Sequence, residues 1–215
     1  FAYEENCLLY LPKTLRKCKR GSREEVEMVA GQIHSLICST YGHTLVLFTS
    51  YTLMGSVYQI LRDGVPFPMV EVWRHSQEEI LRFKTMENAV LFAAGSCWEG
   101  VDFPGDMVSS LIIVKLPFAV PDPISEAEKE TYESLEDYIR AIIVPDMQKK
   151  LRQGFGRAIR TETDTCVVSI LDFRAVKGGK YHEDVMCALP PCQMAEELRE
   201  VQDFIRSRKG VEYYL

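Results

Sequence analysis

Short apolar runs alternate along the chain with segments in which apolar residues recur at helical spacing. The runs are rich in Val, Ile and Leu, as strands of a sheet covered on both faces require. They lie at 44–49, 69–73, 89–94, 110–116 and 166–171. A helical stripe precedes the first run and consists of Val26, Val29, Ile33 and Ile37. This alternation predicts an α/β fold with a mainly parallel sheet flanked by helices.

Capping residues predict where further helices begin. A helix is expected at about 51–61, directly after the first strand. Ser125 has Glu128 three residues later, a capping-box spacing that predicts a helix starting at Ser125. Pro145 suits the first position of another helix, which we expect to run towards Arg160. A charged stretch at about 194–209 predicts a C-terminal helical tail. The sequence shows no internal repeat and no linker, so we expect one domain over 1–215.

Composition and charge restrict the possible functions. The chain is 47% hydrophobic and 26% charged, as is ordinary for a globular protein. Its net charge of -6 argues against general affinity for nucleic acid, so any such binding must be local. A basic cluster occupies residues 13–23, where a solvated loop and a phosphate contact are the two interpretations.

Several classes of protein are disfavoured. No apolar run is long enough to span a membrane, and the first ten residues lack the pattern of a signal peptide. Seven cysteines without a C-x-x-C pair favour reduced thiols and a cytoplasmic location, with no membrane partner. The chain begins with Phe1 rather than Met, as expected for a fragment of a longer protein.

The motifs of self-sufficient enzymes are missing from the sequence. No G-x-x-x-x-G-K-[ST] phosphate loop, G-x-S-x-G elbow or H-E-x-x-H zinc motif is present. The four histidines are scattered, which favours surface or core roles over a metal site. We therefore expect no complete nucleotide site within this chain.

The segment at 153–160 reads Gln-Gly-Phe-Gly-Arg-Ala-Ile-Arg. On a helix, Arg157 and Arg160 would share one face and could bracket an anion, because a guanidinium forks onto phosphate oxygens. Gly154 and Gly156 are costly within a helix, and close approach of a ligand or backbone would explain them. The alternative is a solvated basic end of a helix.

A second group of candidates follows the strand at 89–94. The loop at 95–106 carries Glu99, Gly100 and Asp102 at the carboxyl end of that strand, where open parallel sheets bind ligands. These carboxylates could contact ribose hydroxyls or a neighbouring arginine. An ordinary turn-rich connection is the alternative.

Together these segments resemble motifs of superfamily 2 helicases of the XPD/DinG type. The matching motifs are Gly-Ser-Cys-Trp-Glu-Gly-Val-Asp at 95–102, Lys-Leu-Pro-Phe at 115–118, Pro-Asp-Pro at 121–123, the 153–160 segment, and Leu-Asp-Phe-Arg at 171–174. Leu-Phe-Thr-Ser-Tyr at 47–51 resembles a further motif, and the resemblance covers most of the chain. It implies a three-layer RecA-like fold and the second motor lobe of a DNA helicase, with 5′-to-3′ polarity.

In that family ATP lies between two lobes, and the resemblance implies roles for individual residues. Arg157 and Arg160 would act on the γ-phosphate as catalytic residues. A nucleotide-binding set would consist of Gln153, Gly156, Glu99, Gly100 and Asp102. A single-stranded DNA set would consist of Thr49, Ser50 and Ser96. The phosphate loop, the Mg²⁺ ligands and any iron-sulfur cluster belong to a first lobe absent here, so the chain alone should not hydrolyse ATP.

Two other functions remain open at this point. A stand-alone RecA-like module could grip nucleic acid or a partner protein without a motor cycle. A small-molecule transferase could use Arg157 and Arg160 as substrate clamps, but it leaves the 98–102 segment unexplained.

Overall fold

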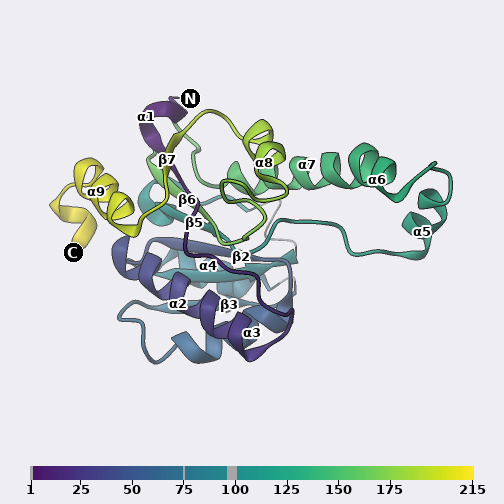
Figure 1. Cartoon of the computed structure of the whole chain (residues 1–215). Helices are drawn as coiled ribbons and strands as arrows, with labels where there is room; N and C mark the ends of the chain where they lie inside the picture. The colour runs from purple at the N-terminus through teal and green to yellow at the C-terminus, as the bar shows by residue number, and fades with distance from the viewer. Residues whose placement is uncertain (1, 75, 96–100) are drawn as a thin grey trace.

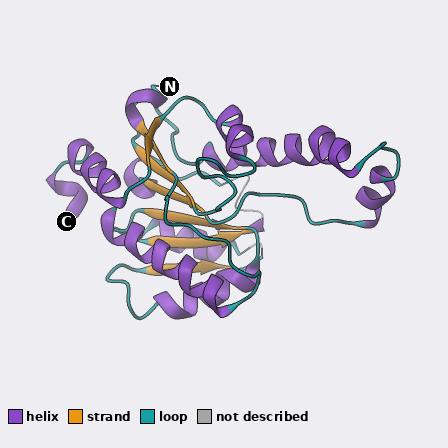
Figure 2. Ribbon diagram, viewed as in Figure 1, coloured by secondary structure: helices purple, strands orange, loops and turns teal. Residues whose placement is uncertain are grey.

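The computed structural model describes residues 2–74, 76–95 and 101–215, and within them one seven-stranded sheet has the order β3-β4-β2-β5-β6-β1-β7. The strands are β1 (Cys7–Tyr10), β2 (Thr44–Phe48), β3 (Met69–Val72), β4 (Val90–Ala94), β5 (Ser110–Ile113), β6 (Cys166–Ile170) and β7 (Gln193–Ala195). Every pairing between them is parallel. The predicted α/β fold is confirmed (Figure 2).

Helices cover both faces of the sheet (Figures 1 and 2). On one face lie α4 (Gln77–Lys84), α7 (Val144–Phe155) and α8 (His182–Ala188); on the other lie α2 (Arg23–Ser39), α3 (Tyr51–Leu61) and α9 (Leu198–Arg208). Neighbouring side chains of a strand point to opposite faces, so Leu45 and Leu47 join one apolar cluster while Val46 and Phe48 join the other. The result is a three-layer sandwich with two cores. Among the described helices, none is long and apolar enough to cross a lipid bilayer.

Several predicted boundaries need correction. The helix expected at Ser125 is α5 (Pro123–Lys129), because the Asp122 carboxylate caps it by accepting the backbone N–H groups of Ile124 and Ser125. The stretch expected to be helical from 194 begins instead with β7, and α9 starts at Leu198. The strands β1 and β7 were not predicted; β7 has three residues, which are too few to show a period.

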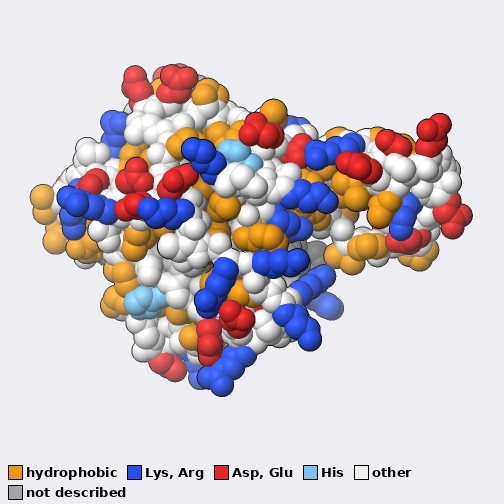
Figure 3. Space-filling model, viewed as in Figure 1, with side chains coloured by type: hydrophobic (Ala, Val, Ile, Leu, Met, Phe, Trp, Pro, Cys, Tyr) orange, Lys and Arg blue, Asp and Glu red, His pale blue; other side chains and the backbone are white. Residues whose placement is uncertain are grey.

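An arm projects from the body of the molecule (Figure 1). Residues 119–143 form it and include α5, α6 (Leu135–Tyr138) and the π-helical turn η3 (Ile139–Ile143), which leads into α7. The arm holds seven Asp and Glu side chains against Lys129 and Arg140. Figure 3 shows acidic side chains towards its end and Lys and Arg side chains gathered on the body beside its base.

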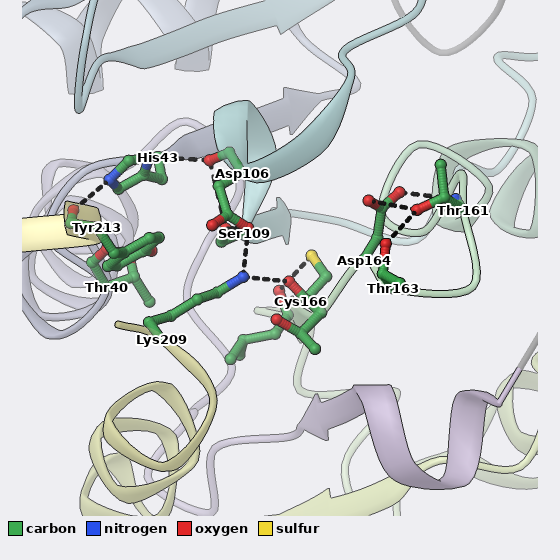
Figure 4. A network of polar contacts seen from close by, with 12 residues as sticks. Thr40, His43, Asp106, Ser109, Thr161, Thr163, Asp164, Cys166, Lys209 and Tyr213 are labelled. Atoms are coloured by element: carbon green, nitrogen blue, oxygen red, sulfur yellow. Dashed lines mark hydrogen bonds and ion pairs between the residues drawn. The ribbon is translucent and has the colours of Figure 1, made fainter. Parts of the chain in front are cut away.

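The C-terminal residues are fastened to the amino-terminal edge of the sheet. After α9, the Lys209 ammonium is almost fully buried and lies 2.5 Å from Asp106 Oδ1 (Figure 4). The Tyr213 hydroxyl donates to the Thr40 carbonyl at 2.7 Å, and its ring stacks on His43 at 4.0 Å between centroids. Both ring nitrogens of His43 face carbonyl oxygens, those of Asp106 at 2.8 Å and Tyr213 at 3.0 Å. We call these five residues the C-terminal clamp. The remaining elements of the described residues are α1 (Tyr3–Asn6), η2 (Gly105–Val108) and η4 (Val211–Tyr214).

Removing the Tyr213 ring should destabilise the chain. Tyr213→Ala deletes a buried aromatic ring and its hydrogen bond, so we expect a loss of about 3 to 5 kcal/mol in the free energy of unfolding, measured by urea denaturation. Val211→Ala, at a 75% exposed position in the same segment, should change it by less than about 0.5 kcal/mol. Equal effects of the two variants would show that the C-terminal clamp adds nothing to the core.

Candidate functional site

The two predicted arginines meet at the loop that follows β4. Arg157 Nη1 donates to the carbonyl oxygen of Val101 at 2.5 Å, and Arg160 Nη2 donates to the same oxygen at 3.1 Å. Arg160 Nε also lies 3.1 Å from Asp102 Oδ1. The structure therefore brings Arg157, Arg160 and Asp102 together at the connection between β4 and β5. The Asp102 side chain is 71% exposed, so its ion pair contributes little to stability.

The backbone that carries the two arginines differs from the predicted helix. The helix expected to continue towards Arg160 ends at Phe155, with Gly156 at its C-terminal cap. Backbone N–H groups of Arg157 and Ala158 then bond to carbonyls three residues back, at 3.0 and 2.9 Å, which makes a tight turn. The prediction that both arginines share a helix face is wrong, because a helix containing two glycines is weak at this end.

Asp164 fixes the backbone around Arg160. Its carboxylate accepts the N–H groups of Arg160 and Thr161, each at 2.8 Å, and the Thr161 hydroxyl also at 2.8 Å (Figure 4). Burial alone would raise the pKa of Asp164, but these donors outweigh it and lower that pKa. Sequence reasoning missed this residue, although a turn-forming Asp soon after an arginine was a usable signal.

Gly156 occupies a position at which the fold itself does not require glycine. Its φ is -60°, and an added Cβ would meet only the carbonyl oxygens of Arg152 and Gln153, at 3.4 and 3.5 Å. These are ordinary contacts, and the residue is exposed. Gln153 lies in the last turn of α7 and is partly exposed. Approach of a ligand therefore remains as the reason proposed for Gly156.

The predicted nucleic-acid residues lie only partly within the described chain. Thr49 directly follows β2 and is exposed. The Ser50 side chain caps α3 by accepting the N–H of Leu53 at 3.3 Å, so it serves the helix as well. Ser96, Glu99 and Gly100 lie outside the described residues.

A buried carboxylate joins the ends of β5 and β6. Asp172 is fully buried and accepts the N–H of Leu116 at 2.9 Å through Oδ2. Arg174 donates to the same carboxylate from its backbone N–H, Nε and Nη2, at 3.0, 2.9 and 2.7 Å. The Arg174 guanidinium also lies over the Phe118 ring, 4.9 Å from its centroid. Asp172 thus fixes the Lys-Leu-Pro-Phe segment against the Leu-Asp-Phe-Arg segment.

Three of the six basic side chains in the cluster at 13–23 have acidic partners. Lys13 pairs with Glu197, Arg16 lies 3.4 Å from Glu24, and Arg23 lies 2.6 Å from Glu27. These partners favour the solvated-loop interpretation of the cluster.

Buried Glu25 ties this loop to the end of β5. Its carboxylate accepts the N–H of Gly21 at 2.7 Å and pairs with Lys115 at 3.0 Å.

Among the described residues, no group of three or more His, Cys, Asp or Glu side chains is placed to hold a metal ion.

Comparisons with known proteins agree with the observed fold and motifs. The family described as helicase C-terminal domain matches residues 33–192. The 3′-5′ exonuclease DinG of Bacillus subtilis is 30% identical over 205 residues, covering 91% of this chain and 22% of that protein. The ATP-dependent DNA helicase YoaA of Haemophilus influenzae is 33% identical over 215 residues, covering 97% of this chain and 32% of that protein. The chain thus spans a third or less of the length of these relatives.

A solved structure supports the same fold. The structure of an XPD helicase matches with a TM-score of 0.64 at 20% identity, covering 88% of this chain and 35% of that one.

The Asp172 carboxylate makes the stability of the chain depend on pH. Burial alone would raise its pKa, but Arg174 and the backbone donors hold the pKa below its usual value of 3.8. The ionised group therefore adds stability that is complete above its usual pKa and is lost as the pH falls through the lowered value. Asp172→Asn should lower the free energy of unfolding at pH 7 by about 1.5 to 3 kcal/mol.

Urea denaturation at several pH values checks this expectation. The gap between wild type and Asp172→Asn should be constant from about pH 7 to 5 and should narrow below about pH 4. Asp203→Asn, at a 61% exposed carboxylate, should follow the wild type throughout. If the difference in unfolding free energy between wild type and Asp172→Asn does not change with pH, the ionised form of Asp172 is not what stabilises the contact between the ends of β5 and β6.

Proposed function

The chain belongs to the helicase C-terminal domain family, as a C-terminal helicase domain of the DinG/XPD type, and from this premise we propose that residues 1–215 are the second motor lobe of an ATP-dependent DNA helicase. Its three-layer RecA-like fold agrees with this placement. The first lobe of the same protein supplies the phosphate loop and the Mg²⁺ ligands, so this chain alone does not hydrolyse ATP. The proposed direction of movement is 5′ to 3′.

The observation that carries this proposal is the meeting of Arg157 and Arg160 at the Val101 carbonyl. Two guanidinium groups at one oxygen place several fixed N–H donors around a single point. A phosphoryl group in transfer has negative charge spread over several oxygens, and such donors stabilise that charge. The donor set therefore fits the phosphates of ATP. We assign Arg157 and Arg160 as arginine fingers acting across the cleft on ATP bound to the first lobe.

Further residues are assigned to contacts with the nucleotide and with DNA. Asp102 pairs with Arg160 and couples its position to the loop after β4. Gln153 and Gly156 lie at the end of α7, next to the turn that carries the arginines. Glu99 and Gly100, which precede Asp102 in the sequence, are assigned to the nucleotide with it. Thr49, Ser50 and Ser96 are assigned to the phosphates of a single DNA strand, because hydroxyl and backbone donors grip a strand without reading its bases.

Replacing Arg160 in the full-length protein tests the finger assignment. Arg160→Ala should reduce DNA-stimulated ATP turnover by about 10³-fold or more while nucleotide affinity changes little, because the finger acts on the charge that develops during transfer. Arg152→Ala, which removes an exposed arginine from the last turn of α7, should retain full turnover. An Arg160→Ala protein within about threefold of wild type contradicts the role, given the size of finger effects. It would favour a RecA-like module that binds nucleic acid or a partner without catalysis.

Gly156→Ala tests whether glycine is needed at this position for nucleotide binding or for folding. The added methyl group fits the free chain, so the free energy of unfolding should change by less than about 1 kcal/mol. If nucleotide approaches this turn, ATP turnover should fall by about tenfold or more, as a small displacement of catalytic groups produces. Gly31→Ala, at an exposed helical position with nothing within 4 Å of the added carbon, is the control. Unchanged turnover in Gly156→Ala would remove Gly156 from the site.

A further inference from the structure

An aromatic pair lies beyond the carboxyl ends of β3 and β2, which flank β4 in the sheet, and none of the roles assigned above uses it. Trp73 directly follows β3, and Tyr51 is the first residue of α3. Their rings stack with centroids 5.5 Å apart and planes 19° from parallel. Trp73 remains 48% exposed. A large ring supported on one side and half open to solvent is a platform on which another flat group can stack.

Two glycines make room for this platform. Gly95, at the end of β4, has φ of +61°, and an added Cβ would lie 2.7 Å from the Tyr51 hydroxyl. Gly55, one turn along α3, faces Trp73, and an added Cβ would lie 3.2 Å from the indole ring. The backbone on both sides is thus closely fitted to the rings. The position of the two rings is therefore fixed by the surrounding backbone, unlike that of two surface side chains in casual contact.

The backbone after Trp73 is strained. Arg74 has φ of +24°, a conformation that residues other than glycine rarely adopt. Such strain persists where the surrounding structure enforces it, and it concentrates at binding sites. The residue directly after the indole thus carries a strained backbone.

The location points to the kind of ligand. In the sheet, β3 is next to β4 and β4 is next to β2, so Trp73, Gly95 and Thr49 follow the carboxyl ends of three adjacent strands. Because all three strands are parallel, these residues lie along one edge. The platform therefore continues the row that begins at Thr49 and Ser50.

We propose that Trp73, backed by Tyr51, stacks on a base of the single DNA strand that this lobe grips. The inference rests on the proposed function and adds base stacking to its phosphate contacts. Every base has a π face, so this contact holds a strand regardless of its sequence, as a translocating motor requires. Arg74 adds a cationic group beside the ring, next to the path of the phosphates.

Binding of a labelled single-stranded DNA to the full-length protein, followed by fluorescence anisotropy, tests the platform. Trp73→Ala should weaken binding by about 5- to 150-fold, the range for loss of one stacked base. Trp73→Tyr should restore most of the affinity because it retains a flat ring. Leu81→Ala, at a 62% exposed apolar position on nearby α4, should bind as the wild type does.

A strand lacking bases separates stacking from phosphate contacts without any mutation. The wild type should bind an abasic strand more weakly than a normal one, whereas Trp73→Ala should show a smaller difference between the two. Equal affinity of the wild type for both strands would overturn the platform, even if Trp73→Ala proved unstable. So would a folded Trp73→Ala protein that binds the normal strand as tightly as wild type.

Failure of the platform and failure of the proposed function give different results. If the full-length wild type shows no ATP turnover stimulated by single-stranded DNA, both proposals fail. If turnover is stimulated but responds equally to Trp73→Ala and Leu81→Ala, the motor function stands and the platform falls.

Discussion

The parallel pairing of all the described strands is the constraint on which the rest of this structure depends. Parallel strands place every carboxyl end at one edge of the sheet and every amino end at the other, because each connection must cross back over a face. Residues that follow β2, β3, β4, β5 and β6 are thereby gathered along a single edge, although they are far apart in sequence. This edge carries Thr49, Trp73, Gly95 and Asp172.

The two edges serve different purposes. At the amino-terminal edge, the C-terminal clamp consists of contacts among Lys209, Asp106, His43, Tyr213 and Thr40, which fasten the end of the chain to the core (Figure 4). At the carboxyl edge, the buried Asp172 carboxylate joins the ends of β5 and β6. Asp164, which fixes the turn around Arg160, precedes β6 by two residues and therefore lies towards the amino-terminal edge.

The distribution of charge qualifies an argument made from the whole sequence. The net charge of -6 by itself predicts no general affinity for nucleic acid. However, seven acidic residues against two basic ones lie in the arm at 119–143, so most of the excess negative charge is on the projection and the body is close to balanced. A whole-chain average thus hides a separation of charge that only the folded shape displays. Electrostatic attraction acts over about 10 Å at ordinary ionic strength, so the local charge matters more than the total.

The sequence by itself determined the fold class, five of the seven described strands, the helix at 51–61 and the family, since apolar periodicity and motif wording are local properties of the chain. It also selected Arg157, Arg160 and Asp102, which the structure brings together. It did not determine how they meet: Arg157 and Arg160 lie in a turn after the helix rather than on it, and their common partner is the backbone carbonyl of Val101. The roles of Asp164 and Asp172, the pairing of β1 and β7, and the stacking of Tyr51 on Trp73 were likewise decided only by the tertiary structure. Each depends on contacts between segments distant in sequence or on the exact direction of a turn, and neither leaves a periodic trace along the chain.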